Sequence, residues 1–348
     1  MKTIINTKYI KNLAFAALAL LSTAAFAQDE EEAPKLEISG SVDAYFRTTT
    51  KDGGDADTAT FTSFANQTGF ALGMANLIGS YDMGDTGVVV DLVFGPRGVE
   101  ATFAEDTFSL NGIINQAYVY WNVSEGTTLT MGRFNTFLGY EVIAPQANFN
   151  YSVSYLFSNG PFSHMGVKAD FTLSDDVSLM LGVMNPWDTN DISGTGEYSL
   201  GAQLGVHGQF LNLYYDSGKN DGLGFEIDYT GGFDVSEDFF FGINAAYNDN
   251  SETGTGFYGA AIYPQLATSD SFALGLRGEY VTFTDDALDD DANVLGLTLT
   301  GSFTKDNLII KPEIRLDSWG NDLEPYLDGD GGFTNSQSSF LIAAIFSF

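Results

Sequence analysis

Apolar and polar residues alternate along most of the chain, and clusters of turn-forming residues separate the alternating stretches. A period of two is typical of β-strands, whereas the spacing of three and four residues that is typical of amphipathic helices is scarce. The pattern predicts 16 strands, near residues 36–49, 70–81, 87–94, 112–122, 127–134, 164–173, 177–186, 199–206, 210–216, 223–233, 239–248, 257–265, 271–284, 293–303, 307–317 and 338–348.

The connections between these strands alternate strictly between short and long. Short turns are predicted near 82–86, 123–126, 174–176, 207–209, 234–238, 266–270 and 304–306. Longer loops are predicted near 50–69, 95–111, 135–163, 187–198, 217–222, 249–256, 285–292 and 318–337. Outer-membrane barrels show this asymmetry, with short periplasmic turns and long external loops. The predicted fold class is all-β: a transmembrane up-and-down antiparallel β-barrel of about 16 strands, within a range of roughly 14–18.

The placement of charges indicates which face of the strands meets water. In the strand 164–173, Val167 and Phe171 alternate with Lys168 and Asp170. A charge that faces lipid at mid-depth costs about 2–4 kcal/mol, so a face that carries both signs is expected in water. A barrel of roughly 16 strands leaves an aqueous channel. The candidate pore-lining charges are Asp43, Arg47, Asp91, Arg133, Lys168, Asp170, Glu226, Asp228, Arg277, Glu279, Lys311, Glu313, Arg315 and Asp317.

Aromatic residues collect near the ends of the predicted strands. In a membrane barrel, such residues form girdles at the two interfaces, although strands favour aromatic residues in any case. The candidates for these girdles are Tyr45, Phe46, Tyr81, Phe94, Trp121, Trp187, Tyr214, Tyr215, Tyr247, Tyr263, Phe283 and Trp319.

The first 27 residues have the pattern of a cleaved secretory signal peptide. A basic leader precedes a short apolar run, and Ala25-Phe26-Ala27 fits the small-x-small cleavage pattern. The run is too short for a spanning helix, although a non-cleaved anchor is the alternative. Residues 28–35 are predicted to form an acidic disordered tail, and residues 36–348 a single barrel domain.

Composition excludes several classes of function. The 348 residues include 14 basic and 46 acidic residues, for a net charge of −32, and removal of the first 27 residues would leave a net charge of −35. This charge argues against a nucleic-acid partner, because nucleic-acid binding needs clustered Lys and Arg. The absence of Cys from the sequence excludes thiolate metal sites, Cys nucleophiles and lipid anchoring at a cleaved Cys.

Residues 131–167 carry a series of short motifs. A Gly-Arg pair ends a strand, and Gly-Tyr-Glu, Asn-x-Asn-Tyr-Ser, Phe-Ser-Asn and His-x-Gly follow in that order. The positions are Gly132, Arg133, Gly139, Tyr140, Glu141, Asn148, Asn150, Tyr151, Ser152, Phe157, Ser158, Asn159, His164 and Gly166. The series resembles the signature of the OmpL-like putative beta-barrel porins of Bacteroidetes-type bacteria. The series covers about a tenth of the chain. The surrounding strand pattern extends the resemblance, less specifically, over the whole mature length. The resemblance implies an outer-membrane porin-like barrel and supplies no substrate.

The C-terminal strand supports the same class. Phe340, Ile342, Ala344, Phe346 and Phe348 share one parity, and the chain ends on an aromatic residue. This arrangement resembles the C-terminal strand that the barrel assembly machinery reads in bacterial outer-membrane proteins.

The predicted loop 135–163 differs from the other loops. It is rich in aromatic residues and contains a single acid, Glu141, whereas most loops are acidic and rich in Gly and Thr. An apolar loop should not extend into water. We expect this loop to fold inward and narrow the pore, and the alternative is that it caps the rim or contacts a partner.

The predicted external mouth is strongly negative. The eight loops hold 22 acids against three basic residues, Lys51, Arg97 and Lys219. A mouth of one sign concentrates counter-ions, so a preference for cations is expected. The alternative is that the acids serve solubility or bridge lipopolysaccharide through divalent cations. The acidic stretches 285–291 and 328–332 resemble calcium loops only loosely, since the spacing and the closing Glu are missing.

The sequence offers little for catalysis. His164 is predicted at the start of a strand and His207 in a short turn, and neither is placed as a general base. No catalytic residue, metal ligand or cofactor site is therefore predicted.

The function predicted from these patterns is passive diffusion of small hydrophilic solutes or ions through a loop-constricted pore in the outer membrane of a Gram-negative bacterium. The predicted partners are outer-membrane lipid, lipopolysaccharide, the assembly machinery and the solutes or cations, with a possible homotrimer. Two alternatives remain: a non-conducting barrel that acts as an adhesin, receptor or structural anchor, and a soluble periplasmic β protein.

Overall fold

The computed structural model describes residues 34–50, 61–103, 110–192, 196–220, 222–288, 291–321, 323–327 and 332–348. The predicted signal peptide 1–27 and most of the predicted tail 28–35 lie outside these ranges. Within them, 16 strands close one barrel: β1 (Lys35–Thr49), β2 (Gly69–Asp82), β3 (Thr86–Phe94), β4 (Ile114–Ser124), β5 (Thr127–Asn135), β6 (Ser163–Ser174), β7 (Val177–Met184), β8 (Ser199–Val206), β9 (Gln209–Tyr215), β10 (Phe225–Asp234), β11 (Phe239–Asn250), β12 (Thr255–Ser269), β13 (Phe272–Asp285), β14 (Ala292–Lys305), β15 (Leu308–Trp319) and β18 (Ser336–Ser347).

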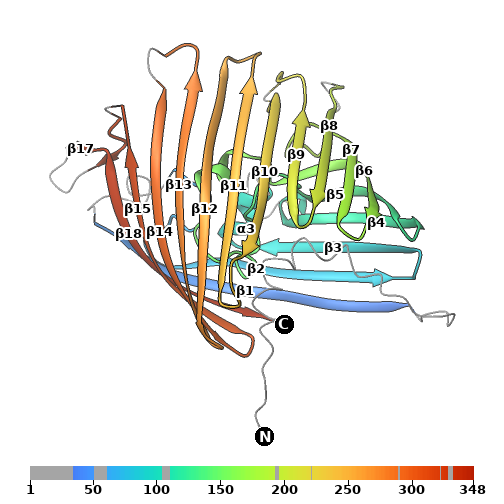
Figure 1. The fold of residues 1–348 in the computed structure, drawn as a ribbon, viewed down its shortest axis with the longest axis horizontal. Helices are drawn as coiled ribbons and strands as arrows, with labels where there is room; N and C mark the ends of the chain where they lie inside the picture. The colour runs from blue at the N-terminus through green and yellow to red at the C-terminus, as the bar shows by residue number, and fades with distance from the viewer. Residues whose placement is uncertain are drawn as a thin grey trace, which may run out of the picture.

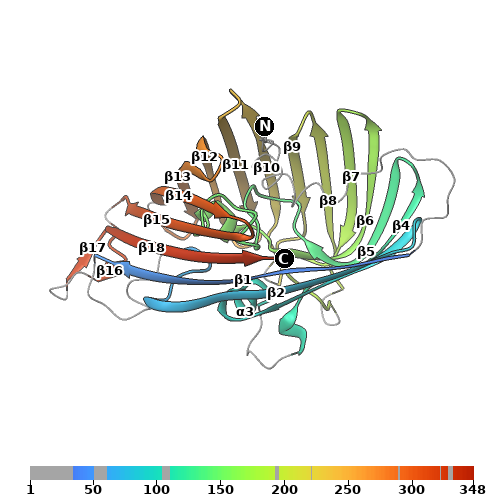
Figure 2. The same cartoon turned by 90° about the horizontal axis from the view of Figure 1, so that it is seen from below.

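Each barrel strand pairs antiparallel with its neighbours in sequence, and the first strand pairs with the last (Figures 1 and 2). The closing register places Val42 opposite Phe346 and Phe46 opposite Ile342. Closure gives every strand two hydrogen-bonded neighbours, which a barrel in lipid requires. The prediction of a 16-stranded antiparallel barrel is therefore confirmed, and the predicted strands match the observed ones to within a few residues at each end.

Among the described residues, few elements lie outside the wall. They are α3 (Pro96–Ala101), the 3-10 helix η2 (Leu110–Ile113), α4 (Tyr155–Asn159) and a small sheet of β16 (Tyr326–Leu327) and β17 (Phe333–Thr334). In the part of the chain that the structure describes, no helix is both long enough and apolar enough to span a membrane.

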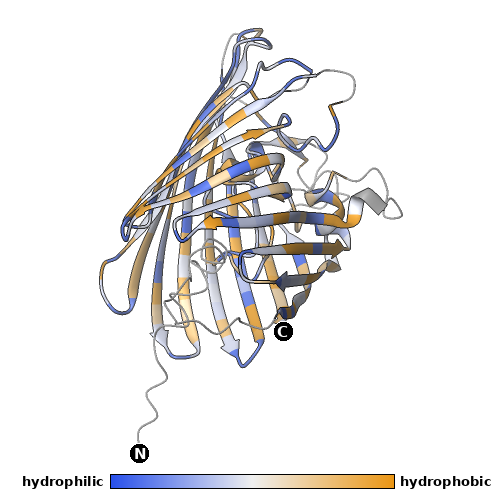
Figure 3. Cartoon of the chain, turned by 90° about the vertical axis from the view of Figure 1, so that its right-hand side faces the viewer, coloured by the Kyte–Doolittle hydropathy of each residue, from blue (hydrophilic) through white to orange (hydrophobic). Residues whose placement is uncertain are grey.

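The two faces of the wall differ in polarity along nearly every strand. In β14, Leu295, Leu297 and Leu299 are exposed on the outside, whereas Thr298 and Thr300 are buried on the inside. Figure 3 shows the alternation of hydrophobic and hydrophilic positions along the strands. The apolar side chains therefore point away from the barrel axis and the charged ones toward it, as a membrane barrel requires.

The prediction of aromatic girdles is partly wrong. Trp121, Tyr215 and Tyr247 are exposed on the outside. The side chains of Tyr45, Tyr214, Tyr263 and Trp319, in contrast, are buried inside the barrel. These four share the parity of polar inward positions in their strands, so they pack against the loop segment in the lumen and do not contact lipid.

A charge placed on the outer face tests the orientation of the wall. Leu299 lies near the middle of β14 and its side chain is 49% exposed. We expect Leu299→Arg to lower the free energy of unfolding in lipid by about 2–4 kcal/mol, because the charge faces hydrocarbon at mid-depth. Leu308→Arg, at the first residue of β15, is the control and should cost about 0–1 kcal/mol. Urea titration in liposomes measures both, and equal effects would contradict a lipid-facing apolar surface.

Candidate functional site in the barrel lumen

The connection between β5 and β6 contacts the opposite side of the barrel. We call residues 136–162 the lumen segment. Its backbone N–H groups donate to carboxylates of three distant strands: Gly139 to Asp228 of β10 at 3.0 Å, Tyr155 to Glu279 of β13 at 2.7 Å, and Tyr151 to Glu313 of β15 at 2.8 Å. These strands lie well away from β5 and β6 around the wall, so the segment crosses the lumen (Figure 2).

Cations of the wall bind the carbonyl groups of the same segment. Arg277 donates to the Ser152 carbonyl at 2.6 Å, and Arg315 donates to the Val153 carbonyl at 2.8 Å. Lys311 donates to the carbonyls of Pro145, at 2.9 Å, and Asn148. A segment without regular secondary structure has unpaired backbone groups, and charged wall residues satisfy them here.

The wall charges also form ion pairs, both with the lumen segment and with one another. Arg277 contacts Glu141 of the lumen segment at 2.7 Å and Glu279 of its own strand at 3.3 Å. Arg315 contacts Asp317 at 2.9 Å. The side chain of Arg277 is 0% exposed and that of Glu141 is 3% exposed. Charges that are removed from water need partners and further hydrogen bonds, and this network provides both.

The residues of the sequence motif shape the lumen segment and attach it to the wall. Gly139 has a φ of 81°, which favours glycine. The Asn148 side chain binds both the N–H and the C=O of Val142, and so closes a turn inside the segment. Ser154, which lies between the motif residues Ser152 and Phe157, caps α4 by accepting from the Phe157 N–H at 3.0 Å.

Other motif residues reach the wall directly. Asn150 donates to the Thr300 hydroxyl at 2.7 Å, and the Tyr151 hydroxyl donates to the Asp43 carboxylate. Tyr140 stacks on Tyr263, with ring centroids 4.3 Å apart. Within the segment, Asn159 donates to the Tyr155 carbonyl and Phe157 packs in an apolar cluster, and Ser158 accepts from the Ser63 N–H of the first long loop. The motif positions Gly132, Arg133, His164 and Gly166 lie in β5 and β6.

An apolar cluster packs the lumen segment against β2, β3, α3 and the end of the first long loop. The cluster contains Phe64, Met74, Val93, Ala101, Ile143, Val153, Phe157 and Phe162. The Arg97 guanidinium lies over the rings of Phe64 and Tyr151, at 4.6 and 5.0 Å from their centroids. The aromatic composition that distinguishes this loop in the sequence is therefore used for packing.

Burial shifts the pKa values of Asp188, which lies beside the lumen segment, and of Tyr151, which lies within it. Burial raises the pKa of Asp188 to about 6, even though its carboxylate accepts hydrogen bonds from the Phe162 and Ser163 N–H groups. Burial and the nearby Asp43 carboxylate raise the pKa of the Tyr151 phenol well above its usual range. Tyr151 is thus a neutral hydrogen-bond donor at any physiological pH.

The fourteen candidate pore-lining charges separate into two groups. Twelve are buried, with exposed fractions of 4% or less: Asp43, Arg47, Asp91, Arg133, Glu226, Asp228, Arg277, Glu279, Lys311, Glu313, Arg315 and Asp317. Lys168 and Asp170 of β6 differ, because their side chains are 12% and 29% exposed and form an ion pair at 2.8 Å. All of the buried charges except Glu226 form hydrogen bonds or ion pairs with the lumen segment or with neighbouring polar groups, whereas the Lys168–Asp170 pair remains partly exposed.

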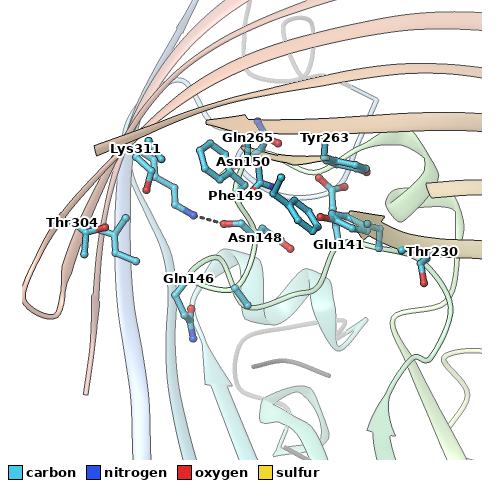
Figure 4. Close-up of a pocket in the computed structure, with 18 of the residues that line it drawn as sticks. Glu141, Gln146, Asn148, Phe149, Asn150, Thr230, Tyr263, Gln265, Thr304 and Lys311 are labelled. Carbon is cyan, nitrogen blue, oxygen red and sulfur yellow. Dashed lines mark hydrogen bonds between the residues drawn. The ribbon is translucent and has the colours of Figure 1, made fainter. Parts of the chain in front are cut away.

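A cavity lies between the lumen segment and the short-turn ends of β9–β15 (Figure 4). Its volume is about 130 Å³. Residues 139–141 and 146–150 of the segment form one side. The other side includes Gly208, Asp270, Ser271 and Thr304, which lie in or beside short turns.

Sequence reasoning did not identify several polar residues of the lumen. Asn212 and Asn244 both donate to Asp228, at 2.6 and 2.5 Å, and Asn76 and Asn115 donate to Asp91. Their inward parity is visible in the strand pattern. Asn residues at inward-facing positions of the predicted strands would have identified them as lumen residues.

The two histidines are placed as the sequence predicts. His164 is buried near the start of β6, and its Nε2 lies 3.0 Å from the Thr136 hydroxyl. His207 lies in a short turn beside Asp176. Half of the 22 acids of the predicted mouth lie outside the described residues, as do residues 289–290 and 328–331 of the two loosely calcium-like stretches. Among the residues that are described, no cluster of three or more potential ligands is placed to hold a metal ion.

Comparison with known proteins agrees with this architecture. The model of the family "Putative beta-barrel porin-2, OmpL-like" matches residues 35–348. No curated protein matches the sequence. Among solved structures, the outer membrane channel DcaP of Acinetobacter baumannii superposes with a TM-score of 0.57 at 14% identity, covering 93% of this chain and all of that one. OmpT, an outer membrane protein of Vibrio cholerae, gives 0.57 at 12% identity, again covering 93% of this chain and all of its own.

An anion-selective porin from Comamonas acidovorans superposes with a TM-score of 0.58 at 10% identity, covering 91% of this chain and all of that one. Identities this low show a shared fold only, so the anion selectivity of that porin is not attributed to this chain.

Proposed function

Because the chain belongs to the OmpL-like family of putative beta-barrel porins, we propose that it forms a pore in the outer membrane through which small hydrophilic solutes or ions diffuse passively. The observation that carries the proposal is the closed barrel with apolar side chains outside and charged side chains inside. Such a wall is suited to lipid on one side and an aqueous path on the other. The lumen segment would set the size limit by occupying part of that path.

The proposed path runs along the wall opposite the anchored part of the lumen segment, past β4–β7. Inward-facing Tyr118, Lys168 and Asp170 are half-buried there, whereas the charges of β13–β15 are buried beneath the segment. A side chain that lines an open path keeps part of its surface in water. Lys168 and Asp170 are therefore the charges that we assign to the narrow part of the path.

The acids of the external loops would favour cations at the mouth. The three basic residues among 22 acids leave the mouth with an excess of negative charge. Three of these acids, Glu100, Glu141 and Asp188, accept hydrogen bonds inside the protein, so the proposed field rests on the other acids of the loops. A negative mouth raises the local concentration of cations and lowers that of anions.

Recording in a planar bilayer tests this function. Purified barrel should give stable conductance steps, and a KCl gradient should give a reversal potential of the sign expected for cation preference. The measurement should be repeated at high salt, where screening of surface charge weakens the preference. An anion-selective reversal potential would contradict the proposed role of the mouth.

The alternative of a non-conducting anchor, adhesin or receptor has a specific observation in its favour. The lumen segment covers most of the inward charges, which an open pore would leave in water. A barrel that inserts without conductance steps would support this alternative and contradict diffusion.

The proposed setting is the outer membrane of a Gram-negative bacterium, reached by cleavage of residues 1–27 and insertion by the barrel assembly machinery. Lipopolysaccharide would contact the acidic loops. A homotrimer is proposed by analogy, because one form of Vibrio cholerae OmpT, with a TM-score of 0.54 at 10% identity, is described as a trimer. Heat-modifiable mobility of outer-membrane fractions, and sizing in mild detergent, test these two points.

A further inference from the structure

The cavity beneath the lumen segment has an unusual lining for a water-filled barrel. Five aromatic side chains surround it: Tyr140, Phe149, Phe210, Phe240 and Tyr263. They come from the segment and from three different wall strands, so barrel closure and the folded segment are both needed to bring them together. Exposed apolar surface inside an aqueous lumen is costly unless something covers it.

Glycines of the wall leave room for these rings. A Cβ atom at Gly275 would meet the Phe149 ring at 2.3 Å, and one at Gly242 would meet the Tyr140 hydroxyl at 2.5 Å. At Gly232 the same addition would meet the Phe240 ring at 2.2 Å. The wall is therefore built to hold flat aromatic faces against the backbone around the cavity.

Polar groups lie among and beside the rings. Gln146 and Gln265 line the cavity, and Lys311 is fixed beside it through the Asn148 and Pro145 carbonyls (Figure 4). An apolar pocket with a few convergent polar groups is the usual form of a small-molecule site. The volume of about 130 Å³ is close to that of an engineered cavity of about 150 Å³ that binds benzene.

We propose that this cavity is a binding site for a molecule of single-ring size with an apolar face and a hydrogen-bonding edge. The rings provide the surface for the apolar face, and the amide groups of Gln146 and Gln265 meet the polar edge. The cavity is bordered by short-turn residues, so the ligand enters from the short-turn side. The site deepens the proposed function, on which its role in transport rests, because it names the class of solute that the pore would retain.

Two neutral probes show which kind of ring the cavity binds. Benzamide is aromatic, and D-glucose has a sugar ring that presents C–H groups on its faces. Saturation-transfer NMR with the barrel in nanodiscs detects binding without any requirement for conduction. Single-channel recording then detects brief reductions of current when the probe is added to one side and then to the other. Binding of either probe, with a stronger effect from one side of the bilayer, is the expected result.

Ser302→Trp fills the cavity from β14 without removing any of the rings, and it should weaken the saturation-transfer signal at least fivefold. Ser178→Trp is the matched control, because Ser178 also lies near the short-turn end of a strand, β7, and does not line this cavity. Phe149→Ala removes a ring from the segment and gives a second test if Ser302→Trp does not assemble.

The outcomes distinguish the site from the pore. Binding that Ser302→Trp abolishes, in a barrel without conductance, supports the site and overturns the diffusion proposal. Conductance without a bound probe, or binding that is equal in Ser302→Trp and Ser178→Trp, overturns the site.

Discussion

Replacement of residues 141–158 by a short Gly-Ser linker is expected to raise the single-channel conductance about threefold or more, because conductance follows the free cross-section of the pore. The lumen segment contacts β1, β10, β13, β14 and β15 through its backbone and side chains, so its removal clears a large part of the lumen. The carboxylates and guanidinium groups that now hold it would then face water.

The barrel should survive this replacement, because each strand keeps both of its hydrogen-bonded neighbours. Heat-modifiable gel mobility checks assembly before any recording is made. If the conductance of an assembled deletion variant equals that of the full chain, the segment is not the constriction.

A disulfide provides the matched control for the deletion. The sequence contains no Cys, so Asn150→Cys with Thr300→Cys introduces a single pair where the two side chains now form a hydrogen bond of 2.7 Å. Oxidation should leave the conductance unchanged if the segment is held in the conducting state. A fall in conductance on oxidation, reversed by reduction, would instead show that the segment leaves the wall when the pore conducts.

The barrel itself was predictable because its signal is local. The period of two follows directly from side chains that alternate between lipid and lumen, and Lys168 and Asp170 beside Val167 already fix the inward parity of β6. Parity also explains the error in the girdles: Tyr45 lies between Asp43 and Arg47 on the same face of β1, so its inward direction was available from the sequence.

The division of the lumen charges was not predictable in this way. Glu313 binds the N–H of Tyr151 across 162 residues of sequence, and nothing in the strand containing Glu313 indicates that contact. The aromatic composition of the lumen segment suggested that it avoids water, but the path it takes depends on many such distant contacts. Inward parity identifies which charges face the lumen, whereas the exposure of those charges depends on whether the lumen segment covers them.

This division leads to the second large effect. Arg277→Met should lower the free energy of unfolding by about 3–5 kcal/mol, because it leaves the buried Glu141 carboxylate without its cation and Glu279 with only the longer contact to Arg315, at 3.9 Å. It also removes the hydrogen bond to the Ser152 carbonyl, so two points of attachment of the lumen segment are lost together. Urea titration in liposomes, followed by gel mobility, measures the change.

Lys168→Met is the matched control, since it removes the cation of an ion pair of similar length on another inward face. That pair is partly in water, so its loss should cost no more than about 1 kcal/mol.

The two variants should differ in the opposite sense in their effect on ion selectivity. Lys168→Met removes a positive charge from the proposed path and should shift the reversal potential toward stronger cation preference, whereas an Arg277→Met barrel should show irregular conductance as the lumen segment loosens. Equal losses of stability in the two variants would mean that the buried and the half-exposed charges stabilise the barrel to the same extent. The distinction between charges that hold the lumen segment and charges that line the path would then be wrong.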